Sequence, residues 1–254
     1  MLFLRSLLFY IGIILALLIF VPIALLLSPL PYQQRYRVIV NWGYFTIWWL
    51  KKTCRLTYQV EGLENIPNTP TIILSKHQSA WETIVYQQIF PAHVWLLKRE
   101  LLYIPLLGWA LASLNPISID RKNLRQSISK IVEQGKQRLA NGLWLLIFPE
   151  GTRVAPGEKK RYGIGGALLG EKTGCPILPV AHNSGQFWPS SSFIKYPGTI
   201  QIVIGSVIDT RDKTYKEINS LVENWIEETV QDIETRERNK MISGKKSSIS
   251  NHPK

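Results

Sequence analysis

One long stretch near the start of this 254-residue chain carries no charge. No Asp, Glu, Lys or Arg occurs between Arg5 and Arg35, and most positions over 7–30 are apolar. About 20 apolar residues are enough to cross the hydrocarbon core of a bilayer. No convincing small-residue cleavage site follows the run, which argues against a signal peptide. The segment therefore predicts an uncleaved N-terminal membrane anchor.

Cysteine is equally scarce, since Cys54 and Cys175 are the only two. Two isolated cysteines exclude a disulfide framework. No metal-ligand spacing joins them to His93, His182 or His252, so we expect no metal site. Both residues are interpreted as buried or half-buried free thiols in a reducing compartment.

Acidic residues are outnumbered, with 18 Asp and Glu against 30 Lys and Arg, which gives a net charge of +12. Such a balance favours an acidic partner: nucleic acid, an anionic membrane surface or a phosphorylated substrate. Nine tryptophans and ten tyrosines favour the membrane, because these rings collect at the boundary between headgroups and hydrocarbon. No nucleic-acid-binding module is apparent, so we expect no nucleic-acid partner.

A second apolar and aromatic stretch covers 38–50 and ends at Lys51 and Lys52. This stretch is shorter than a typical membrane span and predicts an interfacial or re-entrant helix. Together with the first apolar run it makes 1–55 the predicted anchoring segment. Basic residues gather after the first apolar run, which places the main domain on the cytoplasmic side. A single span would leave the amino terminus outside, whereas a helical hairpin would keep both ends inside; the sequence leaves both open.

From about Tyr58 onward, short apolar runs alternate with helix-length segments, which predicts an α/β domain over 56–235 with a largely parallel or mixed sheet flanked by helices. The expected strands cover 71–75, 94–97, 116–119, 143–148, 177–181 and 199–204. Helices are expected over 123–141 and 215–233, the second with apolar residues at core spacing. The basic, serine-rich tail 236–254 is expected to be disordered.

His77 is the first candidate catalytic residue. It lies just after the apolar run 71–74 and precedes Glu82 by five residues. A histidine takes up a proton near neutral pH when a carboxylate bound to its other nitrogen fixes the tautomer. Residues five apart on one helix do not share a face. The pair can meet if His77 lies in a loop and Glu82 in the first helical turn, but the pair alone is equally explained by a structural role.

Three further strand ends carry charged residues: Lys98, the pair Asp120 and Arg121, and the run 149–153. Ligands of open α/β sheets bind at the carboxyl ends of strands, so Lys98, Arg121 and Arg153 are candidates to hold one anion together. Two of them have an alternative role: Lys98 can be merely solvated, and Arg121 can pair only with Asp120 or Glu150.

Two glycine-containing segments also bear on this site. Gly151 would let the backbone approach a ligand, and the adjacent Glu150 can either hold Arg153 or bind a substrate hydroxyl. Gly163, Gly165 and Gly166 do not match a nucleotide-binding spacing, and close helix packing is the preferred interpretation.

Together these residues resemble the glycerolipid acyltransferases. That family carries a histidine followed five residues later by an aspartate, a strand ending in arginine, a Phe-Pro-Glu-Gly-Thr-Arg block and a proline-containing apolar block. The corresponding positions here are His77 with Glu82, 117–121, 148–153 and 175–180. The blocks occur in order over residues 60–210, and the one departure is Glu82 in place of aspartate.

The resemblance implies a membrane-bound O-acyltransferase of phospholipid biosynthesis at the cytoplasmic face of a bacterial inner membrane. It would transfer an acyl group from acyl-CoA or acyl carrier protein to the sn-2 hydroxyl of lysophosphatidic acid, giving phosphatidic acid, without a cofactor. His77 would be the general base and Glu82 its orienting acid. The implied substrate-binding residues are Lys98, Arg121, Glu150, Gly151, Thr152 and Arg153. A different lysolipid acceptor, a lipid ester or thioester hydrolase and a non-catalytic lipid-binding protein remain as alternatives.

Overall fold

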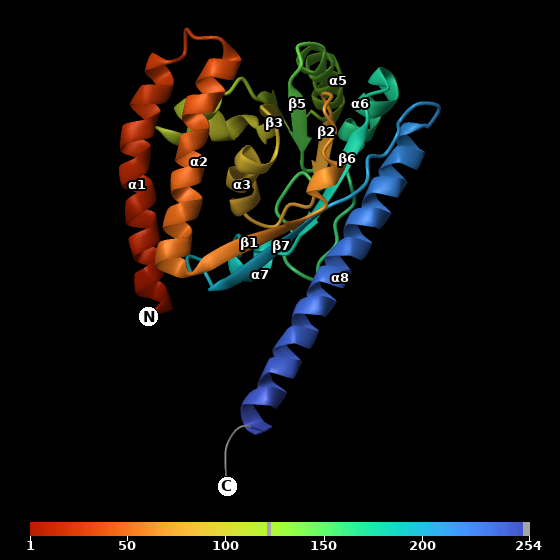
Figure 1. The fold of residues 1–254 in the computed structure, drawn as a ribbon. Coiled ribbons are helices and arrows are strands. Elements are labelled where there is room, and N and C mark those ends of the chain that lie inside the picture. The colour runs from red at the N-terminus through yellow and green to blue at the C-terminus, as the bar shows by residue number, and fades with distance from the viewer. Residues whose placement is uncertain (121–122, 251–254) are drawn as a thin grey trace.

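A computed structural model describes residues 1–120 and 123–250, and it shows a seven-stranded mixed sheet flanked by helices (Figure 1). The strands are β1 (Leu56–Glu61), β2 (Ile72–Ser75), β3 (His93–Lys98), β4 (Ile117–Ile119), β5 (Trp144–Ile147), β6 (Ile177–His182) and β7 (Gly198–Ile204). The predicted α/β class is confirmed. Six strands lie where the apolar runs predict them, and β1 is the additional one.

The strand order is β1-β7-β6-β2-β5-β3-β4. All neighbours from β6 to β4 pair in parallel, as do β1 and β7, and only β6 and β7 pair antiparallel. The carboxyl ends of β2, β3, β4, β5 and β6 therefore share one edge of the sheet. The loops that leave this edge are the expected place for a ligand.

Helices cover both faces of the sheet. They are α1 (Leu2–Leu26), α2 (Tyr32–Cys54), α3 (Trp81–Ile89), α4 (Leu107–Ala112), α5 (Leu124–Ala140), α6 (Gly165–Thr173), α7 (Ser184–Phe187) and α8 (Tyr215–Ser250), with 3-10 turns at Leu63–Asn65 and Arg99–Tyr103. One core lies between the sheet and α1, α2 and α3, the other between the sheet and α5, α6 and α8. Strand residues alternate between them: Ile73 enters the first core, Ile72 and Leu74 the second.

The two N-terminal helices form an antiparallel hairpin, seen side by side in Figure 1. The thiol of Cys54 at the end of α2 lies 3.7 Å from the carbonyl oxygen of Arg5, so the chain returns to where it began. Within the described residues, α1 alone is long and apolar enough to cross a membrane.

The helix α2 is longer than the predicted stretch 38–50, because it begins directly after Pro31. Its first turns hold it to the sheet, since the hydroxyl of Tyr32 donates to the carbonyl of His93 (2.7 Å) and that of Tyr36 contacts His93 Nδ1 (3.1 Å). The opposite side of the hairpin exposes large apolar residues, among them Leu7, Ile11, Leu15, Leu18, Tyr44 and Trp48.

The helix α8 differs from the sequence prediction. Its first half is a core helix as expected, with Ile218, Val222 and Ile226 fully buried. The helix continues to Ser250, however, where the sequence predicted a disordered tail over 236–254. Glutamate, arginine and lysine are good helix formers and no proline interrupts this stretch before Pro253. Residues 251–254 lie outside the described part of the chain.

Candidate active site

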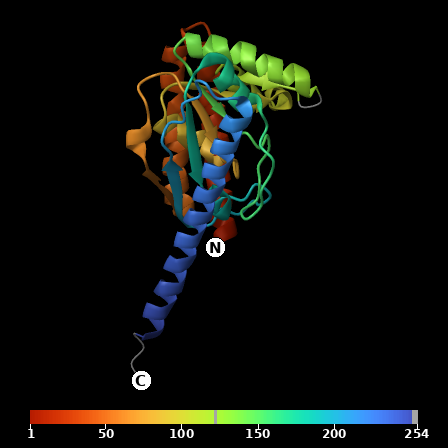
Figure 2. The same ribbon diagram turned by 90° about the vertical axis from the view of Figure 1, so that its right-hand side faces the viewer.

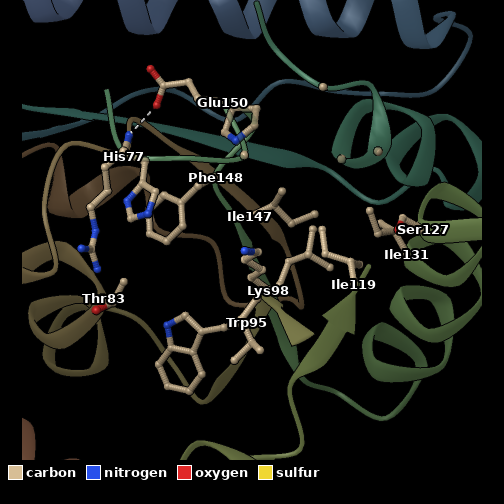
Figure 3. Close-up of a pocket in the computed structure, with 18 of the residues that line it drawn as sticks. His77, Thr83, Trp95, Lys98, Ile119, Ser127, Ile131, Ile147, Phe148 and Glu150 are labelled. Atoms are coloured by element: carbon tan, nitrogen blue, oxygen red, sulfur yellow. Dashed lines mark hydrogen bonds between the residues drawn. The ribbon is translucent and has the colours of Figure 1, made fainter. Parts of the chain in front are cut away.

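His77 lies in the loop between β2 and α3, at the carboxyl edge of the sheet. Its ring stacks on Phe148, with centroids 4.0 Å apart and planes inclined by 15°. The backbone is fixed on both sides, since Val154 donates its N–H to the His77 carbonyl (2.8 Å) and Lys76 donates its own to Val180 (3.0 Å). Figure 3 shows His77 and Phe148 together at one end of a cavity.

The Nδ1 atom of His77 lies 2.8 Å from the carboxylate of Glu82. Because a carboxylate only accepts, Nδ1 carries the proton and Nε2 keeps its lone pair. Glu82 is in the first turn of α3 and is fully buried. The geometry expected for the pair, with the histidine in a loop and the acid on the following helix, is therefore present.

Glu82 accepts four more hydrogen bonds besides that from His77. One oxygen accepts the backbone N–H groups of Gln78 and Ser79 (both 2.8 Å), and the other accepts the hydroxyls of Ser79 (2.6 Å) and Ser184 (3.0 Å). Burial alone would raise the pKa of Glu82, but nearby His182 and the bonds from His77 and Ser79 oppose it and hold that pKa well below its ordinary value. Glu82 is thus kept ionised.

His182, at the end of β6, supports the same loop. Its Nδ1 accepts the N–H of Ser184 (3.2 Å), so its Nε2 is the protonated nitrogen and donates to the Lys76 carbonyl (2.9 Å). Burial lowers the pKa of His182, which favours this neutral form. Neither His182 nor Ser184 was expected at the site, because neither belongs to a spacing that predicts chemistry.

Glu150 follows β5 and lines the cavity, but its carboxylate pairs with Lys76 rather than with Arg153. Its Oε2 accepts the backbone N–H of His77 (2.7 Å), and its Oε1 lies 2.7 Å from the ammonium of Lys76. Burial raises the pKa of Glu150 to about 7, against the lowering influence of Lys76. The carboxylate therefore holds the histidine loop, and no ion pair with Arg153 occurs among the described residues.

The turn after Glu150 brings Arg153 to the cavity. Gly151 adopts a φ of +67°, which favours glycine, and a side chain there would meet open space. Thr152 is half-buried and does not line the cavity. Arg153 lines it with an exposed side chain. Such an arginine can form a two-pronged contact with a phosphate.

The cavity beside His77 has a volume of about 790 Å³. Among the described residues, four cationic ones line it: Lys98, Arg153, Lys160 and Arg161. Lys98 also forms an exposed ion pair with Glu100 (3.3 Å). Of the three strand-end cations expected to act together, Lys98 and Arg153 both line this cavity, and Arg121 lies outside the described residues. The sequence did not predict Lys160 and Arg161 at this site, because they lie in a long loop away from any strand end.

Much of the remaining wall of the cavity is apolar. This part is formed by side chains from β3, β4, α5 and β5 with the residue after it, including Trp95, Ile119, Ile131, Ile147 and Phe148, which Figure 3 shows around the space. Lipid chains and other apolar ligands bind in such clefts, and a few polar groups then fix their orientation.

The glycine-rich segment packs closely, as preferred from the sequence. A side chain at Gly165 would approach Ile131 to 2.8 Å, and one at Gly166 would approach Leu74 to 2.6 Å. These glycines let α6 lie against α5 and β2. No group of three or more potential metal ligands occurs among residues 1–120 and 123–250. Both cysteines in this part of the chain are free thiols.

Comparison with known proteins gives a consistent result. The Acyltransferase family model matches residues 57–183. A 1-acyl-sn-glycerol-3-phosphate acyltransferase of Pseudomonas aeruginosa is 43% identical over 90% of this chain and 91% of its own, and one from Helicobacter pylori is 31% identical over 61% of this chain and 68% of its own. The crystal structure of the Thermotoga maritima 1-acyl-sn-glycerophosphate acyltransferase PlsC superposes with a TM-score of 0.74 at 24% identity, covering 91% and 95% of the two chains, which shows a shared fold. This chain belongs to the acyltransferase family.

Proposed function

We propose that this protein transfers a fatty acyl group from a thioester to the free sn-2 hydroxyl of 1-acyl-glycerol-3-phosphate, giving phosphatidic acid. The proposal rests on the position of His77. Its Nδ1 is hydrogen-bonded to an ionised Glu82, and its ring lies at a cavity that has both a cationic and an apolar wall. The names of the relatives from Pseudomonas aeruginosa and Helicobacter pylori support the same acceptor.

In the proposed reaction, Nε2 of His77 removes the proton from the acceptor hydroxyl as its oxygen attacks the thioester carbonyl. The tetrahedral intermediate then collapses, the carbon–sulfur bond breaks, and the imidazolium returns its proton to the departing thiolate. Glu82 stabilises the imidazolium that exists between these two steps. No acyl-enzyme intermediate is needed, since neither Cys54 nor Cys175 lines the cavity and Ser79 donates its hydroxyl to Glu82.

The two walls suit the two ends of the acceptor. Lys98 and Arg153, with Arg121 as predicted from the sequence, would hold the phosphate and so position the hydroxyl, an orientation effect that can amount to several kcal/mol. An acyl chain would occupy the apolar wall. A hydrolase acting on a neutral ester or thioester would have no use for these cations, which favours the phosphorylated acceptor.

The exposed apolar side of the hairpin suggests the site of action. We propose that α1 and α2 insert into the cytoplasmic leaflet of the inner membrane, with both ends of the hairpin and the α/β domain in the cytoplasm. Acceptor and product would then remain in the leaflet, and the soluble donor, acyl-CoA or acyl carrier protein, would arrive from the cytoplasm. No cofactor is needed for this reaction.

The test is an assay of purified protein with both thioester donors against a panel of lysolipids with and without a terminal phosphate monoester. Phosphatidic acid formed fastest from lysophosphatidic acid supports the proposal. Release of free fatty acid without an acceptor would support a hydrolase, and preference for another lysolipid would change the acceptor.

A further inference from the structure

Behind His77, a network of buried side chains links the site to α8. The ammonium of Lys76 lies 2.7 Å from Glu150 Oε1 and 2.7 Å from Glu227 Oε1. The hydroxyl of Tyr162 donates to the same oxygen of Glu227 (3.0 Å). The side chains of Lys76 and Glu150 are 1% and 0% exposed, and that of Glu227 is 10% exposed.

The net gain in stability from such an arrangement is expected to be small. Desolvating two charges costs about as much as their attraction returns, and apolar side chains of similar volume often stabilise a core equally well. What the network does achieve is the placement of Glu150, whose second oxygen accepts the N–H of His77. His77 is therefore held twice, at its ring by Glu82 and at its backbone by Glu150.

We propose that Lys76 and Glu227 are positioning residues for acyl transfer, which fix Glu150 in the orientation that holds the His77 backbone. The inference rests on the proposed function. Glu227 lies on α8, outside the 57–183 segment that the family model matches. Figure 2 shows α8 lying across the domain and extending beyond it, and this helix contributes Glu227 to the network as well as apolar residues to the core.

The charges in the network make its role pH-dependent. Oε2 of Glu150 accepts the N–H of His77 and Oε1 pairs with the ammonium of Lys76, so a proton on this carboxyl would disrupt one of its two contacts. Burial raises the pKa of Glu150 to about 7, and Glu227 raises it while Lys76 lowers it. The other titratable groups near the network are Tyr162, Glu223, His77 and His182. Removing the charge of Glu227 should lower the pKa of Glu150.

Two substitutions at Glu227 distinguish the loss of its contact with Lys76 from the loss of its negative charge. Glu227→Leu removes one of the two carboxylates that hold Lys76. We expect kcat to fall about 10-fold or more, while KM for donor and acceptor stays within about twofold of the wild-type value, because the substitution disturbs the position of His77 and not substrate binding. Glu227→Gln keeps the shape and an acceptor, so kcat at alkaline pH should be retained while the acid midpoint of the kcat profile moves to lower pH. The control is Glu228→Gln, the next residue of α8, which is exposed.

The full-length variants are assayed with lysophosphatidic acid and acyl-CoA over pH 5 to 9, with thermal melting to verify folding. A folded Glu227→Leu variant with the kcat of the control overturns the proposal. A pH dependence of kcat for Glu227→Gln that coincides with that of the control also overturns it. If the leucine variant does not fold, the result for Glu227→Gln alone tests the proposal. Absence of transfer by the wild type and Glu228→Gln would instead reject the proposed function itself.

Discussion

The Nδ1 atom of His77 and the Oε1 atom of Glu82 lie 2.8 Å apart, although five residues separate them along the chain. They meet because His77 precedes α3 and Glu82 occupies its first turn, where the side chain reaches back toward the loop. The extra methylene of glutamate does not disturb the contact. The same carboxylate also binds two backbone N–H groups and two serine hydroxyls, so the loop is built around the longer acid.

His77→Ala should lower acyl transfer by about 10²- to 10⁴-fold, which is the range for loss of a general base. Rates with lysophosphatidic acid measure the effect, while circular dichroism and membrane fractionation should match the wild type. Lys172→Ala, at a solvent-exposed ion pair, is the control and should retain full activity. Turnover by the alanine variant at the wild-type rate would exclude His77 as the base.

Glu82→Asp should lower kcat by about 10- to 100-fold, because a shift of roughly 1 Å in a positioning group can have an effect of this size. The shorter side chain cannot reach His77 and keep the contacts to Ser79 and Ser184 together. Steady-state kinetics measure the change, and Glu228→Asp on the surface of α8 is the matched control. Activity equal to the control would mean that the loop adapts to the acid of the wider family.

Arg153→Ala should raise KM for lysophosphatidic acid by about 10- to 100-fold, the size expected for one hydrogen bond to a charged group. The effect on kcat should be smaller. Monoacylglycerol, which lacks the phosphate, provides the internal comparison, because its KM should not change. Lys216→Ala, an exposed cation on α8, serves as the control variant. An unchanged KM for lysophosphatidic acid would remove Arg153 from the phosphate site.

Ile119→Trp should shift acyl-chain preference toward shorter chains, because the larger ring would occupy part of the apolar wall that Ile119 forms. The measurement is competition among acyl-CoA donors and lysophosphatidic acids of different chain length. Ile119→Leu keeps the volume and should keep the wild-type preference. Identical selectivity in both variants would show that chains bind elsewhere.

Reporter tags at the amino terminus and after Arg238 should both be accessible from the cytoplasm, because the hairpin brings Arg5 back to Cys54 at the end of α2. Protease protection in spheroplasts distinguishes the two sides of the membrane. A tag inserted after Tyr103, in the α/β domain, gives the cytoplasmic reference. Tags on opposite sides would show instead that α1 spans the membrane alone.

The fold was largely predictable because its central strands are continuous apolar runs, as in parallel sheets buried on both faces. β1 was missed because it alternates: Leu56 is buried, whereas Gln59 and Glu61 are exposed, and it lies at the edge of the sheet. The helical end of α8 was missed for a different reason. A polar, charged composition is shared by disordered tails and by exposed helices, so composition alone did not separate them.

The residues of the site also fall into two groups, those that the sequence predicts and those that it does not. His77, Glu82, Glu150 and Arg153 were found because strand ends and fixed spacings point to one edge of the sheet. Lys76 and Glu227 were not, since 151 positions separate them and only the packing of α8 against β6 brings them together. The signal in the sequence was Lys76 itself, which follows the buried strand Ile72–Ser75 directly, since a lysine in a buried position needs a partner of opposite charge.

The pairing of β1 with β7 has a consequence for biosynthesis. Thr57 and Thr199 lie side by side in these strands, 142 positions apart. At the usual pace of translation this interval lasts on the order of 10 seconds. The hairpin leaves the ribosome well before the sheet can close, so membrane delivery has time to precede folding, and the domain would complete its edge strand already docked at the bilayer.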